Sequence, residues 1–158
     1  MENRKKLHDY SICLIVLAIA NLFTFFTTIV SSWIDGTIER TIAEKAEPAL
    51  HTAVWICVII IFVLMAAIVA SDILIGIKGL KVSKNPDAKK GYITVSKVFF
   101  VLTVIGVVSS LTTLFDPTYG SATDKIVSLC NVTLDAIIYF LFIKTATAIR
   151  KDVLDGKM

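Results

Sequence analysis

The sequence predicts an all-α integral membrane protein, a bundle of four transmembrane helices with both termini on the cytoplasmic side. Three observations predict this fold. Apolar residues make up 56% of the 158 residues, against about 45–50% in soluble domains. They gather in four stretches of ~20 residues or more, the length that crosses a bilayer. The Lys and Arg residues that flank these stretches lie almost all on alternate connections, as the positive-inside rule predicts for an even number of crossings.

The first span is expected from about Tyr10 to Trp33. Its apolar core is roughly twice the 7–15 residues of a signal-peptide core, so we expect a retained helix. The other spans are expected at about 53–77, 93–115 and 126–149. Four such spans with short connections use nearly all of residues 1–158, which predicts a single transmembrane domain. A weak similarity between the first and third spans also allows the bundle to be two parallel helical hairpins.

The connection at 34–50 is predicted to contain a short amphipathic segment outside the membrane. Ile34, Ile38 and Ile42 recur every four residues with charged residues between them, which is the spacing of one helical face. Two interpretations stay open: an ordered connector on the bilayer surface, or a docking face for a partner. The connection at 83–91 has the Pro, Gly and polar residues that are typical of a turn.

Basic residues predict which ends of the spans face the cytoplasm. Arg40, Lys45 and Lys125 flank the ends expected outside, and the remaining thirteen of the 16 Lys and Arg residues flank the opposite ends. These thirteen are Arg4, Lys5, Lys6, Lys78, Lys81, Lys84, Lys89, Lys90, Lys97, Lys144, Arg150, Lys151 and Lys157. The asymmetry predicts a multi-pass protein of the cell membrane with cytoplasmic termini. This basic collar is expected to attract the anionic lipids of the bilayer, and the pattern does not favour nucleic acid as a partner.

The residues most able to carry chemistry are polar groups within the spans. Asp135 lies about 13 Å from the outer end of the fourth span at 1.5 Å per residue, near the bilayer centre. Asn131 and Tyr139 lie four residues to either side on the same helical face, and Asn21 of the first span could meet Asp135 across the bundle. Two interpretations stay open. Asp135 could couple to a proton or cation with the others as neutral ligands, or the group could be a hydrogen-bond clamp between helices or protomers.

A second group of charges, Asp72, Lys97 and Lys144, lies near the predicted cytoplasmic ends of the spans. It predicts either a structural ion pair with interfacial charges, or a charge at the entrance of a pathway. Small residues at the four-residue spacing that favours close helix packing occur in two places. They are Ala66 with Ala70 in the second span and Gly106 with Ser110 in the third. Gly76 and Gly79 are expected to make the cytoplasmic end of the second span either flexible or tightly packed.

No metal or cofactor site is expected. His8 and His51 are predicted on opposite sides of the membrane and cannot share a metal ion. Cys13, Cys57 and Cys130 form no Cys-x-x-Cys motif. Cys57 and Cys130 are predicted at similar depth, so a disulfide between them stays open.

The sequence therefore predicts a small non-enzymatic polytopic membrane protein. We expect an accessory, assembly or protective (immunity-like) subunit that acts through helix–helix contacts. It is expected to work as a homo-oligomer or with a larger membrane-protein partner, since no nucleophile–base pair or catalytic domain can be identified. The alternative is a minimal oligomeric transporter or channel for a proton, cation or small polar solute, using the mid-membrane Asp, Asn and Tyr residues.

Overall fold

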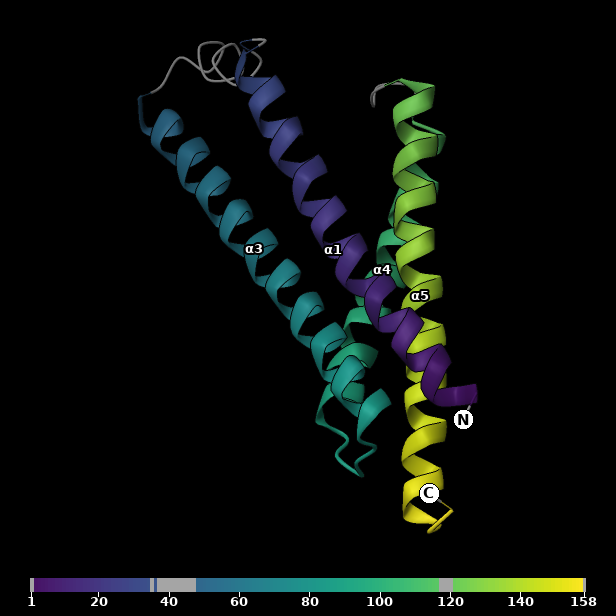
Figure 1. Cartoon of the computed structure of the whole chain (residues 1–158). Helices are drawn as coiled ribbons and strands as arrows, with labels where there is room; N and C mark the ends of the chain where they lie inside the picture. Colours follow the sequence, from purple (N-terminus) through teal and green to yellow (C-terminus); the bar gives the residue numbers. More distant parts are fainter. Residues whose placement is uncertain (1, 35, 37–47, 117–120, 158) are drawn as a thin grey trace. The chain divides into compact units, whose positions relative to one another are not determined.

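The computed structural model describes residues 2–34, 36, 48–116 and 121–157. These residues form four long helices (Figure 1): α1 (Glu2–Ile34), α3 (Pro48–Lys84), α4 (Gly91–Leu114) and α5 (Ala122–Leu154). Each helix is long and apolar enough to cross a membrane. For the described residues, the predicted all-α class and the four helices able to span a membrane are thus confirmed. Most of the predicted amphipathic segment at 34–50 lies outside the described residues.

The helices extend beyond the predicted spans. α3 continues through Lys84 instead of ending near residue 77, because the lysines that end the apolar stretch are themselves good helix formers. α5 begins at Ala122, ahead of the predicted span, because Ser121 and Asp124 form a capping box. The Ser121 hydroxyl oxygen accepts a hydrogen bond from the Asp124 N–H at 3.2 Å. The Asp124 carboxylate accepts one from the Ser121 N–H at 3.3 Å, which satisfies two backbone donors that a helix start leaves unpaired.

The described chain divides into two compact units. One contains Met1–Ile15 and Leu74–Met158, and the other contains Val16–Ile73. The first unit therefore holds the beginning of α1, the end of α3, and all of α4 and α5. The second unit holds the remaining parts of α1 and α3.

In the first unit, α4 and α5 lie side by side (Figure 1). The ring of Phe99 stacks on that of Tyr139 with centroids 6.1 Å apart. Gly106 faces Val132 closely, since a Cβ atom added at Gly106 would lie 3.0 Å from the Val132 Cγ1. The small residue predicted to mark a packing face in the third span therefore lies in a helix contact.

In the second unit, α1 and α3 contact through the rings of Phe25 and Phe62, whose centroids are 6.1 Å apart. Their remaining surface is apolar on all sides: every side chain of Ile59–Leu64 is between 48% and 60% exposed. Ala66 and Ala70 are also exposed, so this small-residue pair marks no close contact within the described chain. A helix that is apolar all round is typical of a span surrounded by lipid or by other helices.

Candidate functional site

The three polar residues predicted to share one face of the fourth span differ in their exposure. Tyr139 is 3% exposed, Asp135 is half-buried, and Asn131 is exposed. Both Asp135 and Tyr139 have interaction partners in the structure. The physical reason for the separation is the helical drift of about 40° for each four-residue step, which puts Asn131 and Tyr139 about 80° apart around the helix axis. A shared binding role for the three stays a prediction.

The other predicted site residues are divided between the two units. Asn21 and Asp72 belong to the second unit, where both are half-buried and have interaction partners. Lys97 and Lys144 belong to the first unit and are exposed. Contacts of Asn21 with Asp135, or of Asp72 with either lysine, therefore stay predictions.

All four helices contribute to a tightly packed junction in the first unit. Ser11 of α1, Ser96 of α4 and Ala146 of α5 are each 0% exposed. Gly79 of α3 has no room for a side chain, because an added Cβ would collide with the Ser11 Oγ and lie 2.5 Å from the Phe142 Cε2. A Cβ added at Gly76 would likewise lie 2.5 Å from the Ile15 Cγ1. Of the two interpretations for Gly76 and Gly79, the structure therefore supports tight packing.

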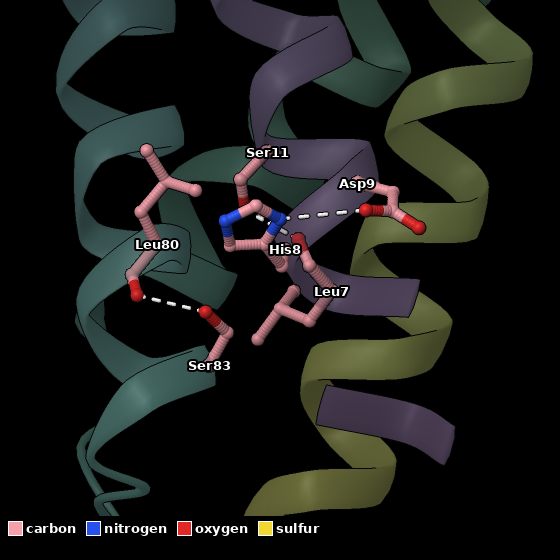
Figure 2. Close-up of polar contacts among 6 residues, drawn as sticks. All are labelled: Leu7, His8, Asp9, Ser11, Leu80 and Ser83. Carbon is pink, nitrogen blue, oxygen red and sulfur yellow. Dashed lines mark hydrogen bonds and ion pairs between the residues drawn. The ribbon is translucent and has the colours of Figure 1, made fainter. Parts of the chain in front are cut away.

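Two buried serines of the first unit have hydroxyl groups that bond to their own helices. The Ser11 hydroxyl donates to the Leu7 carbonyl oxygen at 2.6 Å, and the Ser83 hydroxyl donates to the Leu80 carbonyl oxygen at 2.8 Å, as Figure 2 shows. Such bonds satisfy a serine without a partner on another helix. The helices can therefore pack closely against these serines, because both hydroxyl groups already have a hydrogen-bond partner.

Two arginines join the three basic segments of the chain. The Arg4 Nε donates to the Ser83 carbonyl oxygen at 2.8 Å, and its Nη2 donates to the Lys84 carbonyl oxygen. The Arg150 Nε donates to the Ala88 carbonyl oxygen at 3.0 Å. The last carbonyls of a helix have no partner within it and carry partial negative charge, which favours a guanidinium there. The N-terminal segment, the α3–α4 connection and the end of α5 thus meet at one end of the first unit.

A hollow of about 840 Å³ lies at this end. It is bordered by the end of α3, the α3–α4 connection and the start of α4, and we term it the lysine hollow. Its charged lining residues are Lys78, Lys81, Lys84, Lys89, Lys90 and Asp87. A second hollow of about 500 Å³ shares Lys84 and adds Arg4, Lys5 and His8. Clustered like charges around a concave surface raise the local concentration of counter-ions.

The basic residues at this end were predicted from the sequence, but the hollow that the lysines line was not. Its one readable signal is the spacing of Lys78, Lys81 and Lys84, which recur every three residues, so that each lies about 60° around the helix axis from the next. That signal depends on α3 continuing to Lys84, which the predicted span boundary did not include. The long-range contacts of Arg4 and Arg150, which hold the surrounding backbone, carry no sequence signal.

The three cysteines are free and exposed, so the structure contains no bond between Cys57 and Cys130. Among the residues that the structure describes, no three His, Cys, Asp or Glu residues form a group that could hold a metal ion.

No family model, curated protein or solved structure matches this chain. Two features of the chain bear on its function: the exposed Asn131 within a helix long enough to span a membrane, and the lysine hollow.

Proposed function

We propose that the protein is a non-enzymatic accessory or assembly subunit that acts through contacts between its spanning helices and another membrane-protein chain. The observation that carries this proposal is Asn131. Its side chain is exposed on α5, five residues or about 7–8 Å inside the outer end expected for this span at residue 126. No water is present at that depth to bond a carboxamide, so a helix of another chain is its natural hydrogen-bond partner.

Exposed hydroxyl groups in the spans differ from Asn131. The Thr27 and Thr28 hydroxyls both donate to the Thr24 carbonyl oxygen, at 2.8 and 2.9 Å. They are satisfied within their own helix and need no partner. The Asn131 side chain has no hydrogen bond within the part of the chain that the structure describes, which singles it out as a contact group.

In this proposal the bundle lies in the cell membrane with both termini in the cytoplasm. The positive-inside rule supports this orientation, and so do the Arg4 and Arg150 contacts, which hold the basic segments at a common end. The arrangement as two parallel helical hairpins stays a prediction.

Replacing Asn131 with Leu is expected to weaken association and leave the protein folded. One interhelical hydrogen bond contributes about 0.6 kcal/mol on average and up to about 1.7 kcal/mol. We therefore expect about a 3- to 20-fold weaker complex. Native mass spectrometry after extraction in mild detergent would measure the fraction of chains that carry a second copy or a different subunit.

The matched control is Cys130→Ala, because Cys130 is the preceding exposed residue of α5. It should associate as the unaltered protein does. The proposal fails if the unaltered protein is recovered only as single chains, or if Asn131→Leu associates as strongly as the control.

A second candidate function, transport, is favoured by the half-buried Asp135 within a spanning helix, since ionisable groups at such positions often line ion pathways. Transport predicts a pH- or cation-dependent flux in liposomes that contain this protein alone, and Asp135→Asn should abolish it. The accessory role predicts no flux under those conditions. A flux that depends on Asp135 would replace the accessory role with transport.

A further inference from the structure

The lysine hollow is a concave, positively charged surface that plays no part in the proposed helix–helix contacts. Its volume of about 840 Å³ falls within the about 300–1,000 Å³ of small-molecule sites. We propose that it binds a phosphate ester, and that the phosphate is carried by the headgroup of an anionic phospholipid. This inference does not depend on Asn131 or on the partner that Asn131 contacts.

The charge of the hollow selects for an anion. Five exposed lysines face one carboxylate, that of Asp87. Asp87 already accepts a hydrogen bond from the Lys89 backbone N–H at 3.1 Å, so its carboxylate is partly used in the turn. Among the described residues, none of the five ammonium groups forms an ion pair. Their mutual repulsion is relieved when an anion binds between them, and lysine is a common ligand of phosphate.

The start of α4 adds backbone donors to these charges. Lys90, the residue that precedes the helix, makes no side-chain capping bond. Gly91 and Tyr92 begin the helix and line the hollow. The first N–H groups of a helix have no partner within it and favour a bound anion. Gly91 also has open space beside it, since a Cβ added there would meet nothing within 4 Å.

The backbone around the hollow is held in place by the two arginines. Arg4 bonds to the end of α3, and Arg150 bonds to Ala88 in the connection. The two guanidinium groups thus stabilise the backbone around the hollow, and the lysine ammonium groups remain available to bind an anion. A binding site whose backbone is already ordered loses less conformational entropy when the ligand binds.

The surroundings of the hollow favour a lipid over a soluble phosphate. Leu74 and Ile77 of α3 are 62% and 39% exposed, and Val95 of α4 is 44% exposed. Leu74 lies about one turn before Lys78, Ile77 lies about one turn before Lys81, and Val95 lies five residues after Lys90, each on the apolar side of the lysine. Acyl chains can cover them while the headgroup lies among the lysines. Basic pockets between spanning helices near the membrane surface bind such headgroups.

The test is a lipid titration of the full-length protein in detergent, followed by native mass spectrometry. Phosphatidylglycerol is compared with phosphatidylcholine. The first variant is K81Q/K89Q/K90Q, which removes three lysines of the hollow. The matched control is K97Q/K144Q/K151Q, which removes three exposed lysines outside it and changes the net charge equally.

We expect phosphatidylglycerol to bind the unaltered protein more tightly than phosphatidylcholine does. At about fivefold per lysine, the hollow variant should bind the first phosphatidylglycerol about 100-fold more weakly, and the control should bind as the unaltered protein does. K81R/K89R/K90R keeps the charges and should keep the binding. Equal losses in the two glutamine variants would overturn the proposal, because they would show attraction by net charge alone.

A third arm separates the two sources of phosphate. Inorganic phosphate is added to the lipid-free protein and to the protein with bound phosphatidylglycerol. Weak binding of inorganic phosphate, and retention of the lipid in its presence, support the phospholipid as ligand. Inorganic phosphate that binds as tightly as the lipid and displaces it would overturn the phospholipid assignment.

Discussion

Phe142→Ala is expected to lower the free energy of unfolding by about 3–5 kcal/mol, the range for truncating a fully buried aromatic residue. Phe142 is 0% exposed. Its ring meets that of Tyr92 edge-on, with centroids 6.2 Å apart at 82°, and it lies against Gly79. Truncation would leave a cavity where all four helices contribute to the packing. Unfolding of the purified protein by SDS, followed by circular dichroism, would measure the loss.

The control for this prediction is Phe140→Ala. Phe140 lies on the same helix and is 53% exposed. It pairs with Phe100 at 6.1 Å, so its truncation is expected to cost only about 0.5–1.5 kcal/mol. Equal losses for Phe142→Ala and Phe140→Ala would contradict the packing described at the junction.

Gly79→Ala is expected to destabilise the protein by about 1–3 kcal/mol, the usual cost of overpacking. The new Cβ would collide with the Ser11 Oγ and lie 2.5 Å from the Phe142 Cε2, so α1 and α3 would have to separate. A loss of stability would be informative, because alanine ordinarily stabilises a helix by about 0.5–1 kcal/mol relative to glycine. The same unfolding measurement applies.

Gly91→Ala is the matched control, because a Cβ at Gly91 would meet nothing within 4 Å. It should leave stability unchanged or raise it slightly. Ser11→Ala removes the hydroxyl oxygen and should restore part of the stability lost in Gly79→Ala. If Gly79→Ala is as stable as Gly91→Ala, the close approach of α1 and α3 at this point is wrong.

The four helices could be predicted because the length of an apolar stretch alone determines whether it can cross a bilayer. Their ends were harder to predict. The second apolar stretch stops near residue 77, yet α3 continues to Lys84, since helix formation does not require apolar residues. The start of α5 was readable in principle from Ser121 and Asp124, whose spacing matches a capping box.

The candidate site was less predictable from the sequence. A four-residue spacing placed Asn131, Asp135 and Tyr139 on one face, but two such steps turn far enough to separate an exposed residue from a buried one. The lysine hollow depends on Arg4 and Ser83, which are 79 positions apart, and on Arg150 and Ala88, which are 62 positions apart. Contacts at such separations follow from the packing of the helices and have no local pattern.

The central claim is that the chain crosses the membrane with its three basic segments on the cytoplasmic side. Single cysteines at Asn85, Thr123 and Asp155, introduced after Cys13, Cys57 and Cys130 are replaced by alanine, would test it with a membrane-impermeant maleimide. In intact cells, we expect labelling at position 123 alone, and labelling at all three positions after permeabilisation. Labelling at position 85 or 155 in intact cells would contradict the account.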